Sequence, residues 1–600
     1  MGKTIIQKIF EKHSNQKPEV GDIIDIDIDV RVARDFGGAN VVRNLEENKL
    51  EIEDPSKTFF TFDCNPTGCD QKYAANQHIC RRFARRNNIK VFDINKGIGT
   101  HLVVDEGIAK PGDTIVSTDS HANILGAIGA FGQGMGDKDI AHAWANGKIW
   151  FKVPPTVKII LKGHPSQQVS PKDVVLKMLE ELGANGLLGY SAEIFGDYVE
   201  DLSLDGRITI ASMATEMGGI IILFPPNQKV IDFYKEKKID IKPVYADEDA
   251  SYEKTIEIDI SDIQPKIALP GHPEDVLDVD EVGDVAVDSG IIASCTNGRF
   301  EDMKVAAKIL KNHKISPERV LKIVPSTDKI WKKCLNNGLI EIFKKAGCLI
   351  GNAGCAGCAA GQIGQTGKHE VEISTGNRNY TGKQGDGNVY LASPATVAAS
   401  LVAGFITTPE NIPSQPKGPK IPEGKEFTTE KTEKKKKTNT KVEGKAWVIK
   451  KDNIDTDMIY HNRYLSVTDI DEMGQYTFEN LKEYEDFAEK AKPGDIVVAG
   501  ENFGCGSSRQ QAVDCFKSLG INVIVAESFG AIYERNAINN AMPIMIAEDI
   551  TKKVDDEDVL KVDFENGEIY DKTKDETFQG KPFSKSQMEI YKRGGLLKKI

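Results

Sequence analysis

The chain has 600 residues, of which 40% are hydrophobic and 28% are charged, and its formal net charge is −13. That length allows several domains with large cores, and the composition is typical of a soluble globular protein. The acidic balance disfavours non-specific nucleic-acid binding, which needs a basic surface. Apolar runs such as 219–224 are too short to cross a bilayer, so we expect no membrane segment.

The first residues enter a helix-like pattern at once, without the hydrophobic stretch of a secretory leader. Ten cysteines in 600 residues are ordinary for an intracellular protein. We therefore expect a cytoplasmic location. In such a reducing compartment, clustered cysteines are more often metal ligands or catalytic groups than disulfides.

Residues 1–408 alternate short apolar strands with helical patterns. We predict strands at 114–117, 157–161, 290–293 and 320–324, and helices at 171–182, 302–312 and 331–346. This alternation predicts an α/β architecture, with helices packed on largely parallel sheets.

The composition changes at residues 409–444, which are rich in Pro, Gly, Lys, Glu and Thr and include four lysines at 434–437. We interpret this segment as a solvated linker; a nuclear-localisation or RNA-binding role for the lysines is the less favoured alternative. A second α/β unit follows at 445–600, with predicted strands at 495–499 and 522–526 and helices at 507–519 and from about 530. Such a tether would suit a mobile lid.

Asp119 and His121 follow the predicted strand 114–117, and His101 could join them in the fold. A carboxylate beside an imidazole suits proton transfer because it raises the pKa of the histidine. A lone histidine would more often be structural. The glycines at 126–136 do not form a Gly-x-Gly-x-x-Gly dinucleotide motif, so we reject that function.

Three cysteines give the strongest chemical signal. Cys295 follows the predicted strand 290–293, and Cys355 and Cys358 form a Cys-x-x-Cys pair among small residues. Three thiolates can hold three corners of an iron–sulfur cube, whereas electron-transfer clusters normally use four. The fourth iron would then be open and act as a Lewis acid. The alternatives are three structural thiols, or a zinc site that would need a fourth ligand.

Two further segments carry cations. Arg378 and Lys383 stand near the Cys-x-x-Cys pair, where they could bind a substrate with several carboxylates; surface ion pairing is the alternative. The Gly-rich turn before Arg509 is predicted to place Ser507, Ser508 and Arg509 in the first turn of a helix. Free N–H groups and an arginine there favour anions, although a serine N-cap is the commoner role of such a motif.

Together, these motifs resemble the aconitase superfamily. The shared segments are Ser-Cys-Thr-Asn-Gly-Arg (294–299), the Cys-x-x-Cys pair, Asn-Arg-Asn-Tyr-x-Gly (377–382), Asp-Ser-His (119–121) and Gly-x-Gly-Ser-Ser-Arg (504–509). They look closest to the 3-isopropylmalate dehydratase and homoaconitase branch, with its large and small parts fused in one chain.

The resemblance implies a [4Fe–4S]-dependent hydro-lyase. Residues 1–408 would form three α/β domains, 409–444 the linker, and 445–600 a swivelling β/β/α domain. The substrate would be a small 2-hydroxy di- or tricarboxylate that is reversibly dehydrated, with isomerisation through the bound alkene as a further option. No nucleic-acid or membrane partner is implied, and a monomer is the expected state.

The resemblance also implies roles for single residues. The cluster, with one open iron, would be held by Cys295, Cys355 and Cys358. Ser507 would be the base that removes a proton from the substrate carbon. Carboxylate–imidazole pairs would come from His101, Asp119, His121 and Glu216. Substrate carboxylates would be held by Ser120, Arg378, Lys383, Arg463, Ser508 and Arg509, with Arg463 reaching a distal carboxylate from the loop 462–467.

Four positions depart from the family pattern. Family members usually carry Asp-His where this chain has Asp63-Cys64, and an arginine where it has Lys383. Ser212 stands where asparagine is common, and Arg34 where a neutral polar residue or histidine is frequent. These changes suggest an unusual substrate or redistributed proton-transfer roles.

Two other function classes stay open from the sequence. One is an iron-responsive RNA-binding regulator that acts without the cluster, which the acidic charge disfavours. The other is an electron carrier, in which Cys334 or Cys348 would supply a fourth cluster ligand.

Overall fold

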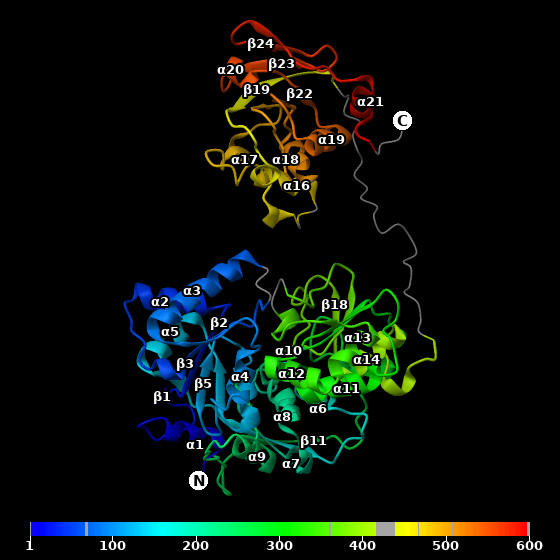
Figure 1. Ribbon diagram of the computed structural model, residues 1–600. Helices are drawn as coiled ribbons and strands as arrows, with labels where there is room; N and C mark the ends of the chain where they lie inside the picture. The colour runs from blue at the N-terminus through cyan, green and yellow to red at the C-terminus, as the bar shows by residue number, and fades with distance from the viewer. Residues whose placement is uncertain are drawn as a thin grey trace. The chain divides into compact units, whose positions relative to one another are not determined.

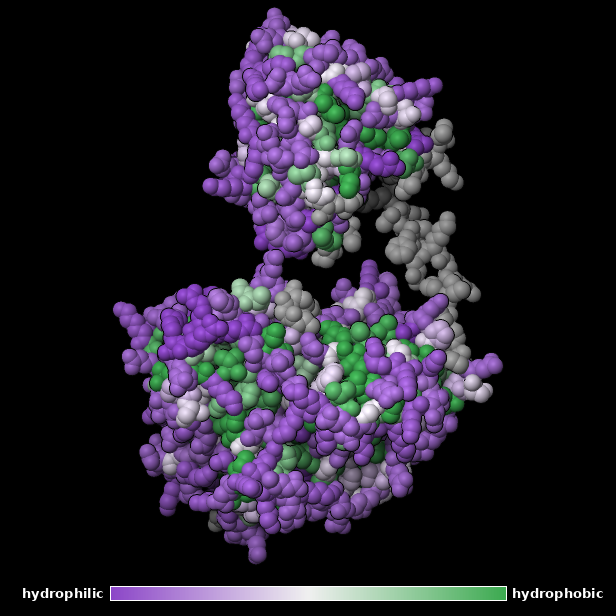
Figure 2. All heavy atoms as spheres, in the orientation of Figure 1, coloured by the Kyte–Doolittle hydropathy of each residue, from purple (hydrophilic) through white to green (hydrophobic). Residues whose placement is uncertain are grey.

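The computed structural model describes residues 2–66, 70–358, 362–415, 439–465, 467, 469–506 and 509–596 (Figure 1). The chain forms two compact units, Met1–Lys425 and Glu426–Ile600. Within the described ranges, every helix is too short or too polar to span a lipid bilayer. Most of the visible surface of each unit is hydrophilic (Figure 2).

Three sheets of parallel or mainly parallel strands organise the first unit. The first sheet has the order β4 (Lys90–Phe92), β3 (Thr58–Thr61), β2 (Val30–Arg34), β5 (Thr114–Ser117) and β6 (Phe131–Gly134). The second has the order β10 (Ile221–Leu223), β9 (Ser191–Phe195), β8 (Thr156–Lys162) and β11 (Lys254–Asp259). The third has the order β13 (Val276–Asp278), β12 (Lys266–Ala268), β18 (Asn388–Ala392), β17 (Val371–Ser374), β14 (Ser289–Ile292), β15 (Val320–Ile323) and β16 (Leu349–Ile350). In the third sheet, β12 pairs antiparallel with both β13 and β18, and a separate antiparallel ribbon joins β1 (Ile23–Asp27) to β7 (Lys148–Lys152).

Helices cover these sheets. Around the first sheet lie α1 (Ile5–Lys12), α2 (Gly38–Glu47), α3 (Gln71–Asn87), α4 (Gly99–Asp105) and α5 (Asp137–Asn146). Next in the chain come α6 (Pro171–Leu182), α7 (Asp197–Asp201), α8 (Leu204–Ala211) and α9 (Gln228–Glu236). With the third sheet are α10 (Ser294–Asn297), α11 (Phe300–Leu310), α12 (Asp328–Asn336), α13 (Leu339–Ala346) and α14 (Pro394–Ala403). Strands β3, β5 and β14 are buried at every position, as expected where both faces of a parallel sheet are covered.

Local sequence explains where these elements begin and end. Helix α6 starts after Ser170, which forms a capping box with Asp173, has Pro171 in its first turn, and ends at Gly183 in a positive-φ conformation. It matches the predicted helix 171–182. The single helix predicted at 331–346 is wrong, because Gly338 adopts φ +75 and separates α12 from α13.

The second unit is built on one mixed sheet. Its order is β22 (Ile544–Ile546), β21 (Val523–Ala526), β20 (Ile496–Ala499), β19 (Lys441–Ile449), β23 (Val559–Asp563), β24 (Glu568–Asp571) and β25 (Glu576–Gln579). The half from β22 to β19 is parallel and the half from β19 to β25 is antiparallel. Its helices are α15 (Thr456–Ile459), α16 (Ile470–Met473), α17 (Phe487–Lys490), α18 (Gln511–Leu519), α19 (Ala531–Asn539), α20 (Ile550–Lys553) and α21 (Lys585–Arg593).

One apolar core links the three sheets of the first unit. It extends from Val32 of β2 through Ile159 of β8 to Leu391 of β18, all fully or almost fully buried. Close packing of this kind holds the strand ends of different sheets in fixed positions. The second unit has apolar cores of its own.

Candidate active site

Two sheets of the first unit have a point where the strand order reverses. In the first sheet this point lies between β2 and β5, and in the third between β14 and β17. In open α/β sheets, ligands bind outside the carboxyl ends of the strands at such points. Arg34 ends β2, Asp119 follows β5, Cys295 follows β14, and Asn377 follows β17.

The three predicted cluster cysteines lie together. Cys295 and Cys355 form one small buried cluster with Ile98, and the partly buried Cys358 packs against it. All three are free thiols. Cys295 lies in α10, and Cys358 ends the 3₁₀ turn η5 (Ala356–Cys358) directly after Cys355. Cys295 and Cys355 are 60 positions apart in the sequence, but their side chains lie together in the fold, as predicted.

A cavity lined in part by Cys355 and Cys358 opens beside these thiols. Its lining combines two of the cysteines with small residues and cationic or amide side chains: His121, Ala293, Cys355, Ala356, Gly357, Cys358, Asn377, Arg378, Lys383 and Gln384. Sulfur donors of this kind suit iron–sulfur clusters. The donor set and the small residues around the cavity therefore fit a cluster bound by three thiolates.

His121 is the centre of a buried charge network beside the cavity. Its Nε2 lies 3.1 Å from Glu216 Oε1, and Arg378 Nε donates to the same oxygen at 2.8 Å. Glu216 lies in η3 (Ala214–Met217) and its other oxygen has no partner among the described residues. Burial alone would lower the pKa of His121, but the Cys295 thiol and the Glu216 carboxylate raise it well above its usual value. The arrangement favours an imidazolium held between acidic groups.

Asp119 lies on the other side of His121. Its Oδ1 accepts a hydrogen bond from the His121 backbone N–H at 3.0 Å and lies 3.2 Å from Arg34 Nη1. Burial opposes ionisation of Asp119, but the Arg34 and His121 charges outweigh it and lower the pKa of the carboxyl. Asp119, His121 and Glu216 are thus brought together, as expected for a proton-transfer network.

His101 lies in the same region but has a different partner. Its Nε2 lies 3.0 Å from the Cys295 carbonyl oxygen, and its Nδ1 has no partner among the described residues. Burial, with the nearby Arg299 charge, lowers the pKa of His101 to about 4. A neutral imidazole follows, hydrogen-bonded to a carbonyl and not paired with a carboxylate.

The predicted substrate-binding residues of the first unit are divided between two hollows. Arg378 and Lys383 line the cysteine cavity, and Lys383 Nζ donates to the Cys358 carbonyl at 3.0 Å. Ser120 is exposed and lines another groove together with Thr118 and Gln133.

Arg509 and Arg463 belong to the second unit. The Arg509 guanidinium forms two contacts with Asp457, at 2.5 and 2.7 Å, and donates to the Tyr460 carbonyl at 3.2 Å. The expectation that Arg509 lies in the first turn of a helix is wrong, because α18 starts at Gln511 and Arg509 is held by Asp457 before it. Arg463 pairs with Glu479 at 2.8 Å. Ser507, Ser508 and Ser466 lie outside the described residues.

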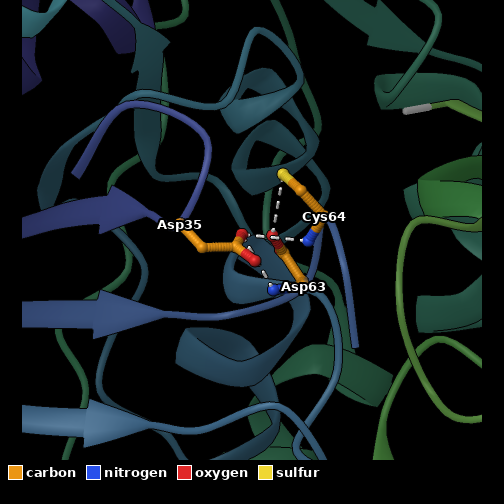
Figure 3. Close-up of side chains that lie close together, drawn as sticks. All are labelled: Asp35, Asp63 and Cys64. Carbon is orange, nitrogen blue, oxygen red and sulfur yellow. Dashed lines mark hydrogen bonds between the residues drawn. The ribbon is translucent and has the colours of Figure 1, made fainter. Parts of the chain in front are cut away.

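Asp35, Asp63 and Cys64 form a further buried group, whose possible ligand atoms lie within 4.8 Å of one another (Figure 3). The Asp35 carboxylate accepts the backbone N–H groups of Asp63, Cys64 and Asn65 at 3.3, 3.0 and 3.2 Å. Burial raises the pKa of the Cys64 thiol well above its usual value, so the thiol is neutral. This group fixes the turn after β3, and its acceptors are already used by N–H donors.

Three residues near the site have no role in the sequence-based assignment. Arg34 contacts Cys355 Sγ through Nη2 at 2.7 Å, and Asp63 accepts from Arg34 Nε at 2.7 Å. Lys172 is fully buried in α6 and donates to the Gly376 carbonyl at 2.7 Å. Two features of the sequence could have indicated these residues. Arg34 is a charged residue at the end of an apolar strand. Lys172 lies in the first turn of a helix, where the helix dipole disfavours cations.

Comparisons with known proteins give a consistent result. A model of the aconitase family (aconitate hydratase) matches residues 7–284 and 280–404, and a model of the aconitase C-terminal domain matches residues 420–549. The 3-isopropylmalate dehydratase large subunit 1 of Methanopyrus kandleri is 38% identical over 414 residues, which are 68% of this chain and 99% of that protein. The 3-isopropylmalate dehydratase large subunit of Halothermothrix orenii is 39% identical over 421 residues, which are 69% of this chain and 100% of that protein.

Two solved structures are similar to parts of the chain. A 3-isopropylmalate dehydratase of Methanocaldococcus jannaschii is 38% identical, with 26% of this chain and 92% of that chain covered and a TM-score of 0.25. Aconitase X of Thermococcus kodakaraensis is 13% identical, with 63% of this chain and 90% of that chain covered and a TM-score of 0.38.

The family model matches well over half of the chain, and about two thirds of the chain covers the relatives from end to end. The resemblance and the α/β class predicted from the sequence are therefore confirmed. The chain belongs to the aconitase family and is a hydro-lyase.

Proposed function

We propose that the protein is a [4Fe–4S]-dependent hydro-lyase that removes water from a 2-hydroxy di- or tricarboxylate and adds it back. The observation that carries the proposal is the convergence of Cys295, Cys355 and Cys358 beside a cavity that Arg378 and Lys383 also line. A cluster bound there by three thiolates would supply a Lewis-acidic iron that polarises the substrate's hydroxyl group.

The residues of the chain would bind the substrate and control protons. Arg378, with 22% of its side chain exposed, offers a cation to a substrate carboxylate while Glu216 fixes its orientation. His121, which lies between Glu216 and Asp119, would donate a proton to the departing hydroxide. Ser507 as the base stays a prediction from the resemblance.

The relatives support a dicarboxylate substrate of the 3-isopropylmalate type as the first candidate. Their names specify a large subunit, and about two thirds of this chain covers them completely. The C-terminal domain match at 420–549 supports a chain in which both parts are fused. The Arg463–Glu479 ion pair favours the same candidate, because it neutralises the cation that would attract a third carboxylate. Homoaconitate- and aconitate-like substrates are second, and the monomeric state and cytoplasmic location stay predictions.

The positions of two other cysteines argue against an electron carrier. Cys334 and Cys348 are buried in the main apolar core of the third sheet, whereas Cys295, Cys355 and Cys358 form a cluster of their own. Neither is placed to complete a four-thiolate site within the described residues. No observation favours RNA binding.

A substrate panel tests the proposal. Anaerobically reconstituted protein is mixed with isopropylmalate, dimethylmalate, citramalate, homocitrate or citrate, and alkene absorbance is followed. We expect turnover of isopropylmalate or a close dicarboxylate relative, and the Ser507→Ala variant should keep its iron but lose turnover. Absence of iron in the reconstituted protein, or no alkene from any of the five acids, would contradict the proposal.

A further inference from the structure

Arg34 occupies the junction between the first and third sheets, and the proposed reaction does not yet use it. Only 10% of its side chain is exposed. Its three guanidinium nitrogens reach three different groups: Nε reaches Asp63 Oδ1 at 2.7 Å, Nη1 reaches Asp119 Oδ1 at 3.2 Å, and Nη2 reaches Cys355 Sγ at 2.7 Å.

Both carboxylates that hold Arg34 are themselves held by backbone groups. The Gly99 N–H donates to the second oxygen of Asp63 at 2.8 Å, and the His121 N–H donates to Asp119 at 3.0 Å. Because the guanidinium is planar and its donors point in fixed directions, two anchored carboxylates determine where the third nitrogen points. Nη2 is therefore aimed at the Cys355 sulfur.

Cys355 is attached to the first sheet in a second way. Its backbone N–H donates to the Asp63 carbonyl at 3.1 Å. The main chain and the sulfur of this residue are thus both held by the ends of β2 and β3, although Cys355 itself follows β16 of another sheet. Within the described residues, Cys295 and Cys358 have no arginine contact of this kind.

We propose that Arg34 is a positioning residue for Cys355 as a cluster ligand, and that its charge-assisted N–H···S hydrogen bond raises the reduction potential of the bound cluster. The proposal depends on the cluster of the proposed function. Hydrogen bonds to sulfur and nearby charge are among the main factors that set the potential of such clusters. A cation with an N–H donor stabilises the more negative, reduced state.

The experiment measures the midpoint potential of the reconstituted cluster by a redox titration followed by electron paramagnetic resonance. It compares the wild-type protein with Arg34→Lys and Arg34→Gln. Arg31→Lys is the matched control, since Arg31 lies near the other end of the same strand β2, is buried and pairs with the Glu53 carboxylate at 2.8 Å. Within the described residues, its guanidinium contacts Glu53 and the Ile28 carbonyl and no cysteine sulfur.

We expect both Arg34 variants to titrate at a lower potential than the wild type, with the larger decrease in Arg34→Gln, and to lose iron faster in air. An ammonium group at position 34 keeps the charge but cannot span all three partners, so Arg34→Lys should fold and still lower the potential. The cluster of Arg31→Lys should have the same midpoint potential as the wild type.

Three results separate the possible failures. No iron and sulfide in the wild-type protein would overturn the proposed cluster itself. A normal cluster whose potential is unchanged in Arg34→Lys would overturn the role of Arg34. An equal decrease in Arg34→Lys and Arg31→Lys would also overturn it, because the effect would then come from the loss of any buried arginine. If Arg34→Gln does not fold, the midpoint potential of the Arg34→Lys cluster alone decides whether the proposal holds.

Discussion

One carboxylate oxygen of Glu216 contacts two basic side chains, those of His121 and Arg378. Glu216→Gln keeps the size of the side chain but removes the charge that orients both partners. We expect kcat to fall by about 10²-fold or more, the usual range for loss of a group that controls proton transfer. Steady-state kinetics with measured iron content checks this. Glu372→Gln is the matched control, since Glu372 is fully buried and pairs with Lys322 at 2.8 Å; equal losses of kcat in both variants would contradict the assignment.

At the scale of single residues, the sequence predicted those parts of the site that follow a strand directly. Cys295 and the Asp119–His121 pair were chosen as candidates in this way, since strand ends at one sheet edge meet in space; their roles stay predictions. Arg34 could not be assigned, because its decisive contact is with a residue 321 positions away. The pairing of His101 with a carbonyl was also beyond the sequence, since local pattern does not specify which group faces an imidazole.

At the scale of elements, helix α6 supports the loop that follows β17. Lys172 Nζ donates to the Gly376 carbonyl at 2.7 Å and lies 3.5 Å from the Thr375 carbonyl. The next residue, Asn377, accepts from Cys295 Sγ at 3.2 Å. This loop therefore takes its position from a lysine on a helix of the second-sheet region.

We expect Lys172→Met to lower kcat by about tenfold or more. Two carbonyl groups of the loop that bears Asn377 would lose the ammonium group that holds them, and the loop would shift. The free energy of unfolding should fall by no more than about 3 kcal/mol, since the cost of unsatisfied carbonyls is partly offset by removing a buried charge. Kinetics and denaturation measured on the same preparation check both parts. Lys177→Met, on the same helix with its ammonium near Glu181, should leave kcat unchanged; a similar loss there would contradict the prediction.

Strand β9 is joined to helix α1 through Glu193. This side chain is fully buried and accepts from the Ile5 N–H at 2.5 Å and the Tyr252 hydroxyl at 2.7 Å. Burial raises the pKa of Glu193 to about 7, against 4.5 for a free glutamate. Because the folded protein binds this proton more tightly, the stabilising contribution is complete below pH 4.5 and is lost as the pH rises through about 7.

Glu193→Gln stays neutral, so its stability relative to the wild type should depend on pH. Relative to the wild type, the variant should have its lowest free energy of unfolding near pH 4.5. By pH 8 this relative free energy of unfolding should have risen by roughly 3 kcal/mol, which is the energy equivalent of the pKa difference. Melting temperatures of both proteins across this pH range test it. A constant difference would show that the pKa of Glu193 is the same in the folded and the unfolded protein, which would contradict the prediction.

Element boundaries were predicted well where capping residues mark them, as in α6. The break between α12 and α13 was missed, because apolar periodicity continues across it and only the φ of Gly338 separates the two helices. Glycine inside a helical pattern lowers helix propensity without specifying a break.

At the scale of the whole molecule, each unit has its own apolar cores, and the boundary between the two units falls within residues 416–438. We expect a chain broken within 416–438 to give two folded proteins that restore activity when mixed, with a rate that saturates as the second protein is added. Linking converts this association into an intramolecular event and adds effective concentration. Activity assays over a dilution series check it, with the unbroken chain as the control. Two folded halves that stay inactive at every concentration would contradict the expectation.

The contact between Arg34 and Cys355 spans 321 positions and has a consequence for biosynthesis. While the ribosome is still making the middle of the protein, Asp63, Asp119 and Arg34 can assemble, but the sulfur that completes their arrangement has not been translated. The iron of the proposed cluster should therefore enter only after both regions have emerged from the ribosome. Iron content of ribosome-bound chains arrested before and well beyond Cys358 would reveal this order, and equal loading of both would exclude it.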